Sequence, residues 1–337
     1  MEIFKKIAPR FLALALMLVA MNYLYVQLFL ESDLQENSPI VNSVRAIPIE
    51  TTVLYFGESS NTSYSELDVN KNSISQMLNQ LLPDEVVSDI TKPAAHSGIY
   101  KVLMENVSET NNIHTVVVTM NLRSFNADWV YSDLESALQK EILLLQNRPD
   151  LYNRFLLSFK GYRPMNDRKR FEKINAWQSS INLKAAGFPA FHNVENWKQS
   201  IKDNWKGNDM EQRQLALNYA NTFGFNINFN KHPRIINFNE IISIAKQKKW
   251  NLVFHILPEN IETMEKLVGS DLTKIVLGNA RKLARYFSEK GVKVINNVSL
   301  NTDKEFSDKA YPTEHYFESG RLAVAQKIKD CFLKGNN

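Results

Sequence analysis

Cysteine is nearly absent from this chain of 337 residues, which contains only Cys331. A single cysteine excludes an internal disulfide and any metal site built from several cysteines. The chain also lacks an excess of one charge, because 40 Lys and Arg residues against 36 Asp and Glu residues leave a formal net charge of +4. This mild balance gives no case for a nucleic-acid partner. No metal-ligand spacing occurs among the histidines His96, His114, His192, His232 and His255. We therefore expect no metal or cofactor.

A long apolar run stands near the N-terminus. Residues Phe11 to Leu30 carry no charge, and only Asn22 and Gln27 are strongly polar. A helix of about 20 apolar residues is long enough to cross a bilayer. Basic residues precede the run and acidic residues follow it, so the positive-inside rule places residues 31–337 outside the cytoplasm. The alternative is a cleaved signal peptide, but the bulky residues 26–30 lack a small-residue cleavage site, and we expect an uncleaved, single-pass anchor.

The rest of the chain alternates between two hydrophobic periodicities. Residues 31–50 are polar without a clear period, and we expect a linker there. Strand patterns follow at 52–56, 114–120, 250–257 and 292–295, and helical patterns at 74–82, 132–146, 261–267, 272–290 and 322–328. Strands that alternate with helices predict a mostly parallel sheet covered on both faces. Residues 150–249 lack strand patterns, so we expect a helical insertion or lid within a domain spanning 51–337.

Polar residues follow two of these strands at the point where each strand ends. The first strand leads into Gly57-Glu58-Ser59, and the strand at 114–120 leads into Asn121. Ligands bind at this carboxyl edge in open α/β sheets. His315 stands in the loop that enters the last helix. A serine hydroxyl becomes a good nucleophile only when a base accepts its proton, and histidine is the natural base near neutral pH. Ser59 and His315 are therefore a candidate catalytic pair, although a capping serine and a surface histidine would fit the same pattern.

In their order along the chain, these residues resemble the sequence blocks of the SGNH (GDSL-like) hydrolases. Gly57-Glu58-Ser59, Gly98, Asn121 and His315 match the four blocks, over roughly 50–145 and 250–330, with Glu58 where the family usually has Asp. The resemblance implies a flavodoxin-like α/β/α fold, with Ser59 as nucleophile and His315 as base. It also implies that the N–H groups of Ser59 and Gly98 and the amide of Asn121 form the oxyanion hole.

The sequence departs from the family at the acid of the triad. The family usually has Asp three residues before the histidine, and Pro312 stands there. Asp308 is the candidate replacement, whereas Glu314, adjacent to His315, is expected to point elsewhere. Some members of the family use a Ser–His pair alone. Glu259-Asn260 lies at the same sheet edge and either lines the substrate pocket or begins a helix.

Together these features predict a membrane-anchored serine esterase or O-acyltransferase outside the cytoplasm, in a compartment such as the periplasm. Its expected substrate is an acyl ester or an acylated glycan, because the combination of anchor and SGNH-like domain resembles proteins that move acyl groups on envelope polysaccharides. One alternative is a catalytically inactive SGNH-like domain that binds glycan or an envelope assembly partner. Another is a membrane scaffold that uses the helices of 150–249 as its partner surface. Fold analogy alone does not choose among them.

Overall fold

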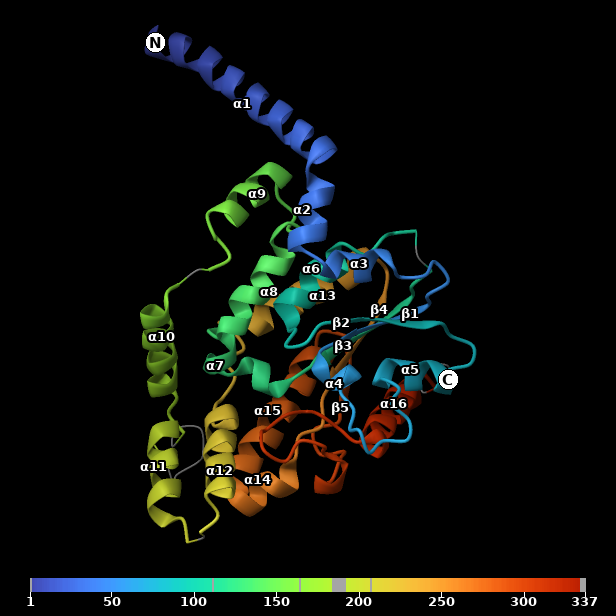
Figure 1. Ribbon diagram of the computed structural model, residues 1–337, viewed down its shortest axis with the longest axis vertical. Helices are drawn as coiled ribbons and strands as arrows, with labels where there is room; N and C mark the ends of the chain where they lie inside the picture. Colours follow the sequence, from blue (N-terminus) through green and yellow to red (C-terminus); the bar gives the residue numbers. More distant parts are fainter. Residues whose placement is uncertain (1, 111, 164, 184–191, 207, 334–337) are drawn as a thin grey trace.

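The computed structural model describes residues 2–333 except 111, 164, 184–191 and 207. Its centre is one parallel sheet in the order β2-β1-β3-β4-β5 (Figure 1). The strands are β1 (Val53–Gly57), β2 (Val87–Thr91), β3 (Thr115–Met120), β4 (Asn251–Ile256) and β5 (Lys293–Asn296). This is the flavodoxin-like strand order, in which the order reverses between β1 and β3 and ligands bind at the carboxyl ends of the strands.

Burial explains which strands the sequence predicts. β3 lies between β1 and β4, and all six of its residues are buried, so its sequence is a continuous apolar and β-branched run. β2 lies at the edge of the sheet and is only partly buried, with Ser88 and Asp89 in its middle. It therefore carries no apolar run, and the strand patterns of the sequence do not predict it.

Helices cover both faces of the sheet. On one face, α5 (Ile74–Leu81) and α16 (Glu318–Leu333) bury Val53, Tyr55 and Val117 in a small core. The alternate residues, Leu54, Phe56 and Val116, face the larger core. That core is formed with α6 (Ser97–Glu105), α8 (Asp133–Leu143), α13 (Pro233–Gln247) and α15 (Ser270–Ser288). Because strand side chains alternate between faces, two helical layers are required, which confirms the predicted three-layer α/β/α fold.

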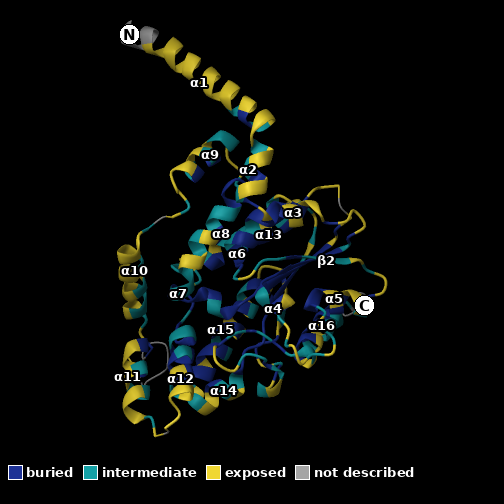
Figure 2. Cartoon of the chain, viewed as in Figure 1, coloured by how far each residue is buried: buried dark blue, intermediate teal, exposed yellow. Residues whose placement is uncertain are grey.

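In the described part of residues 150–249 the regular elements are helices joined by turns and loops. They form α9 (Asp150–Ser158), α10 (Asp167–Ser180), α11 (Val194–Asn204), α12 (Met210–Phe223) and α13. α10 and α11 are largely exposed at one side of the molecule (Figure 2). α13 instead packs along α6 and buries Ile235, Phe238 and Ile241 in the larger core. The last helix of this segment is thus part of the layer that covers the sheet.

The N-terminal helix α1 (Glu2–Leu28) projects away from the body (Figure 1). Its apolar stretch Ile7–Leu28 is long enough to cross a membrane, and only 6% of that stretch is buried by protein. The prediction of a linker without regular structure at 31–50 is wrong. These residues contribute to α2 (Leu30–Asn37) and form α3 (Ile40–Arg45), and their few apolar side chains, such as Leu34 and Val41, enter the larger core. Helices this short give too few turns for a visible period.

The remaining elements are short and connect the layers. They are α4 (Ser59–Thr62), α7 (Ala127–Val130), α14 (Ile261–Leu267) and the 3-10 helices η1 (Leu122–Phe125) and η2 (Asp303–Glu305). α4 follows β1 and η1 follows β3, so both lie at the carboxyl edge of the sheet.

Candidate active site

Ser59 stands at a sharp turn between β1 and α4. β1 ends at Gly57, and Glu58 caps α4 because its Oε1 atom accepts a hydrogen bond from the Ser60 N–H at 3.0 Å. A Cβ atom at position 57 would lie 2.9 Å from the Asn61 Cβ and from the Tyr55 ring. Glycine is therefore needed for this close approach. The turn leaves the Ser59 side chain half-buried at the carboxyl edge of the sheet.

Asn61 fixes α4 to its neighbours. Its Nδ2 group donates to the Thr91 hydroxyl at 2.7 Å and to the Ser75 hydroxyl at 3.1 Å, while its Oδ1 atom accepts from the Ser75 N–H at 2.9 Å. These bonds tie the helix that carries Ser59 to β2 and α5. This role cannot be predicted from the sequence, because the partners of Asn61 come from later segments of the chain.

His315 is held in a loop that folds back on itself. Phe306 and Tyr316 form an antiparallel bridge, and the Ser307 N–H donates to the His315 carbonyl at 3.0 Å. The Tyr316 hydroxyl donates to the Pro258 carbonyl at 3.0 Å, which fixes the loop beside the end of β4. The His315 Nε2 atom then lies 3.2 Å from the Ser59 Oγ atom. The fold thus brings the predicted nucleophile and base within hydrogen-bond distance.

The Ser59 hydroxyl has a second partner in its neighbour Glu58. Its Oγ atom donates to the Glu58 Oε2 atom at 2.9 Å. A hydroxyl carries one hydrogen, so Glu58 and a neutral His315 Nε2 compete for it. When Nε2 is the unprotonated nitrogen, the Ser59 proton can pass to the imidazole. The Glu58 carboxylate then lies where it stabilises the positive charge that forms on His315.

The surroundings of His315 favour the neutral imidazole. Burial lowers the pKa of His315 below its usual 6.5, and the nearby Arg123 cation lowers it further. Glu58 and Asp308 act in the opposite direction. The net lowering of the pKa leaves His315 unprotonated at neutral pH, as a general base must be.

Asp308, the predicted acid, uses its carboxylate to shape the loop. Its oxygens accept hydrogen bonds from the Ala310 N–H at 3.0 Å, the Tyr311 N–H at 3.2 Å and the Thr313 hydroxyl at 3.1 Å. Its negative charge raises the pKa of His315 from nearby, but its hydrogen bonds among the described residues go to these three groups. The structure therefore does not place Asp308 in a hydrogen bond with the imidazole.

The three predicted oxyanion donors differ in their availability. Ser59 is the first residue of α4, so its N–H has no intrahelical acceptor. The Gly98 N–H donates to the His96 Nδ1 atom at 3.1 Å, so this single donor is engaged. The Asn121 Nδ2 group donates to the Glu314 Oε2 atom at 2.8 Å. An amide nitrogen carries two hydrogens, which leaves one for a further acceptor.

A buried charged cluster lies behind the Ser–His pair. Glu314 accepts a hydrogen bond from Arg123 Nη2 at 2.5 Å, and Glu259 is buried close by, where its charge acts on the pKa of Arg123. Burial raises the pKa of both Glu259 and Glu314, and repulsion from Glu314 raises that of Glu259 further, against the attraction of Arg123. One guanidinium cannot balance both acids and Glu58 in a buried site, and this favours the protonated form of Glu259.

This cluster is not predicted by the sequence patterns described above. Glu314 does point away from the imidazole, as expected, but toward Asn121 and Arg123. Glu259, expected at the pocket or at a helix start, is buried, and Asn260 caps α14 through the Thr263 N–H at 3.1 Å. Among the described residues, no group of three or more His, Cys, Asp or Glu side chains is placed to hold a metal ion.

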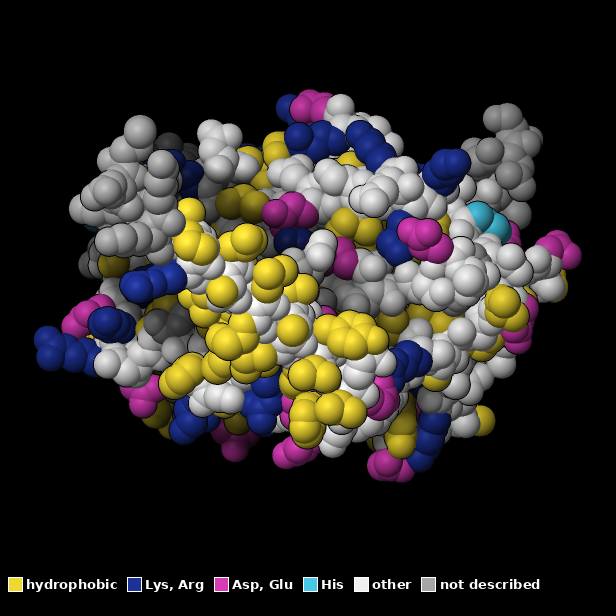
Figure 3. Space-filling view, turned by 90° about the horizontal axis from the view of Figure 1, so that it is seen from above, with side chains coloured by type: hydrophobic (Ala, Val, Ile, Leu, Met, Phe, Trp, Pro, Cys, Tyr) yellow, Lys and Arg dark blue, Asp and Glu magenta, His cyan; other side chains and the backbone are white. Residues whose placement is uncertain are grey.

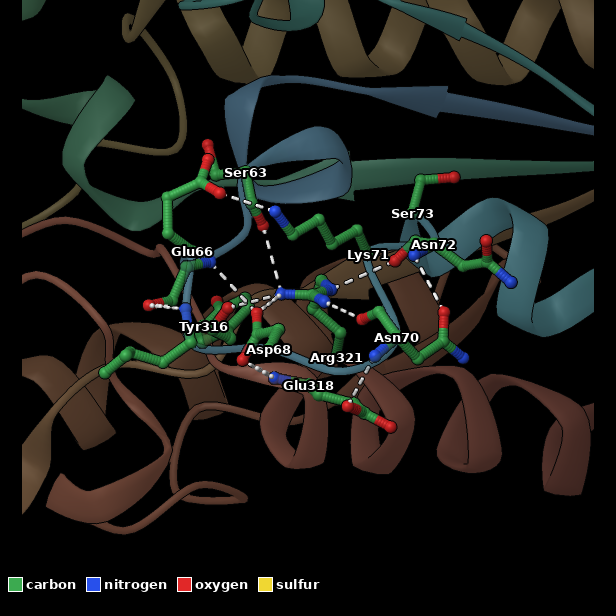
Figure 4. Close-up of polar contacts among 12 residues, drawn as sticks. Ser63, Glu66, Asp68, Asn70, Lys71, Asn72, Ser73, Tyr316, Glu318 and Arg321 are labelled. Atoms are coloured by element: carbon green, nitrogen blue, oxygen red, sulfur yellow. Dashed lines mark hydrogen bonds and ion pairs between the residues drawn. The ribbon is translucent and has the colours of Figure 1, made fainter.

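Arg321 joins the segments that carry Ser59 and His315 (Figure 4). It is fully buried in α16. Its guanidinium donates to the Asp68 carboxylate at 2.8 Å and to the Tyr316 carbonyl at 2.8 Å. Further bonds go to the carbonyls of Ser63, Asn70 and Asn72. The loop after α4 and the residue after His315 are thus held by one side chain.

Comparison with known proteins gives distant structural similarities. No family model and no curated protein matches the sequence. Among solved structures, the chain is similar to a GDSL-like lipase from Bacteroides thetaiotaomicron, with 12% identity, a TM-score of 0.37, and coverage of 88% of this chain and 97% of that one. It is also similar to the lipase/acylhydrolase from Enterococcus faecalis, with 9% identity, a TM-score of 0.36, and coverage of 85% and 96%.

Proposed function

We propose that this protein is a serine esterase or O-acyltransferase of the SGNH type, with Ser59 as nucleophile and His315 as general base. The observation that carries the proposal is the 3.2 Å contact between Ser59 Oγ and His315 Nε2 at the carboxyl edge of a parallel sheet. These residues are 256 positions apart in the chain, so their contact is a product of the fold. The lowered pKa of His315 keeps the base in its active form at neutral pH.

The reaction proceeds by two acyl transfers. Ser59 Oγ attacks the ester carbonyl carbon while its proton passes to His315 Nε2. The Ser59 N–H and the second hydrogen of Asn121 Nδ2 donate to the oxyanion of the tetrahedral intermediate. The C–O bond of the ester breaks, and His315 returns the proton to the leaving oxygen. Water or a sugar hydroxyl then attacks the acyl carbon of the acyl-enzyme while its proton passes to His315 Nε2. The bond between the acyl carbon and Ser59 Oγ breaks, and His315 returns that proton to Ser59 Oγ.

The location of this chemistry follows from α1. We propose that Ile7–Leu28 crosses the membrane and anchors the domain outside the cytoplasm, as the basic residues before the span favour. A substrate there is an acyl ester or an acylated glycan of the cell envelope. Hydrolysis and transfer to a glycan hydroxyl use the same Ser59 and His315 and differ only in the acceptor.

A second candidate is a non-catalytic domain that binds a glycan or an envelope assembly partner. The observations that favour it are the Gly98 N–H, which already donates to His96, and the Asp308 carboxylate, which is hydrogen-bonded within its own loop. Such a domain would not depend on the Ser59 hydroxyl. Its cellular phenotype would persist in a Ser59→Ala variant.

A fluorophosphonate probe separates the two candidates, because it reacts only with an activated serine. The full chain in detergent should be labelled, the Ser59→Ala variant should not, and His315→Ala should be labelled about 10²–10⁴ times more slowly. Ser63→Ala, four residues along and half-buried at the end of α4, is the control and should be labelled like the parent. Labelling that survives Ser59→Ala, or no labelling of the folded chain, would contradict the enzyme proposal.

A further inference from the structure

Helix α9 is attached to the anchor helix by polar contacts. The Leu151 N–H donates to the Asn22 Oδ1 atom of α1 at 2.8 Å. Arg154 forms an ion pair with Asp33 of α2 at 2.7 Å, and the Tyr25 hydroxyl donates to the same carboxylate at 2.8 Å. Figure 1 shows α9 beside the junction of α1 and α2. α9 therefore keeps a defined position along the axis of α1.

That position is level with the end of the apolar span. Asn22 lies six residues before Leu28, the last residue of the span. At about 1.5 Å per residue, Asn22 is about 9 Å inside the span measured along the helix. Asp33, the partner of Arg154, lies five residues beyond Leu28, so the contacts of α9 extend from inside the span to beyond its end. If α1 crosses a bilayer, α9 therefore lies across the depth where hydrocarbon meets the headgroups. The Leu151 N–H also provides a partner for the Asn22 side chain, one of the two strongly polar residues in the apolar run.

The outward face of α9 suits this depth. Tyr152, Phe155 and Phe159 are spaced as one helical face, and they are 51%, 48% and 80% exposed. The opposite face, with Asn153 and Leu157, is buried against the body. Three large aromatic side chains exposed on one stripe are costly in water, whereas aromatic residues are favoured at membrane–water interfaces.

Basic residues flank the aromatic stripe. The Arg148 guanidinium lies 5.8 Å from the Tyr152 ring, and Lys160 and Arg163 follow the helix. Between 148 and 163 the chain has four basic residues and one acid, Asp150. Figure 3 looks onto the end of the molecule from which α1 projects and shows a band of hydrophobic side chains with Lys, Arg, Asp and Glu side chains around it. A cavity of about 1010 Å³ next to α9 is lined by the cations Lys140, Lys160, Arg163, Lys169 and Arg170, together with Asp133 and Asp167.

We infer that α9 and residues 159–163 form a second membrane contact, seated in the interface of an anionic phospholipid leaflet beside α1. The aromatic stripe inserts among the upper acyl chains, and the basic residues contact the lipid phosphates. Two contacts, at α1 and α9, prevent the domain from rotating about its anchor. The inference rests on the anchoring by α1 proposed above.

Site-directed spin labelling of the full chain tests the inference. The only cysteine, Cys331, is replaced in a Cys331→Ser background whose fold is checked by its melting temperature. Single cysteines are then introduced by Phe155→Cys, Phe159→Cys, Leu18→Cys in the span and Leu322→Cys. Leu322 is the matched control, a helical residue 45% exposed on α16, far from α1 in Figure 1. The proteins are reconstituted in phosphatidylcholine vesicles containing phosphatidylglycerol.

Collisions with oxygen, which partitions into lipid, are compared with collisions with a water-soluble nickel chelate. We expect the oxygen-to-nickel ratio at 155 and 159 to be several-fold higher than at 322, and to fall toward the value at 322 when phosphatidylglycerol is omitted. Water-like ratios at 155 and 159 with a lipid-like ratio at 18 would overturn the inference and leave the anchor in place. Water-like ratios at all four positions would overturn the anchor proposal, and this inference with it.

Discussion

The Nδ2 atom of Asn121 lies 2.8 Å from the Oε2 atom of Glu314, the residue directly before His315. This bond joins the end of β3 to the loop that carries the proposed base. It also orients the Asn121 amide, so that one hydrogen is engaged and the other is free to donate to a substrate oxyanion. Asn121 can therefore act on the reaction in two ways, directly as a donor or indirectly through Glu314.

Two substitutions separate these roles of Asn121. Asn121→Ala removes the donor, and we expect the kcat of ester cleavage to fall by about 10²–10³. Glu314→Gln keeps the donor and can still accept its hydrogen bond, so kcat should fall by less than tenfold. Steady-state kinetics with a chromogenic acyl ester measures both. Equal losses in the two variants would show that Asn121 acts only through Glu314.

The pH dependence of activity should reflect the environment of His315. Because burial lowers the pKa of His315, the acidic limb of kcat/KM should have its midpoint below pH 6.5. The Glu58 carboxylate raises this pKa, so Glu58→Gln should move the limb to still lower pH. Asp308→Asn should move it in the same direction by less, since Asp308 is a weaker influence. A limb that moves upward in Glu58→Gln would show that the titrating group is not His315.

Glu259 should make the folded protein less stable as the pH rises. The unfolded chain releases this proton near pH 4.5, whereas burial raises the pKa of Glu259 well above that value in the folded protein. A raised folded pKa adds stability at low pH that is lost as the pH increases. We expect Glu259→Gln to reduce the fall in melting temperature between pH 5 and pH 8. Glu265→Gln, an exposed change on α14, the helix that follows Glu259, is the control and should keep the parent slope.

Arg321 should be essential for holding the site together. It is fully buried and paired with Asp68, so Arg321→Met leaves a buried carboxylate unpaired. Breaking a buried pair from one side costs about 3–5 kcal/mol of unfolding free energy, measured by denaturant titration. Arg321→Lys should restore little of the lost stability, because an ammonium group cannot reach all five acceptors that the planar guanidinium contacts. Leu322→Ala, exposed on the next position, should change stability by less than about 0.5 kcal/mol. An Arg321→Met variant as stable as the parent would contradict this role of Arg321.

The parts of this protein that are predictable from sequence are those set by short-range patterns. β1 and β3 are buried on both faces and read as apolar runs, and Ser59 and Asn121 directly follow these strands. His315 reaches the same edge in another way, in the loop that leads from β5 into α16. β2 was missed because an edge strand needs no apolar run. The hydrogen bonds of Asp308 depend on the path of its loop, which no local pattern fixes.

The buried charged cluster escapes prediction for a related reason. Arg123, Glu259 and Glu314 come from three separate segments, and no local pattern in the sequence shows that they meet. Their pKa values depend on burial, which follows from the complete fold. The mostly polar segment 31–50 likewise contains a few apolar residues, and only the complete fold shows that these residues pack in the larger core.

The most direct test of the account is to trap the acyl-enzyme. The full chain is mixed with an activated acyl ester, quenched in acid within milliseconds to seconds, digested and examined by mass spectrometry. We expect one acyl group on the peptide that contains Ser59. This acylated peptide should be absent in Ser59→Ala and should form far more slowly in His315→Ala. An acyl group on a different residue, or ester consumption that continues unchanged in Ser59→Ala, would contradict it.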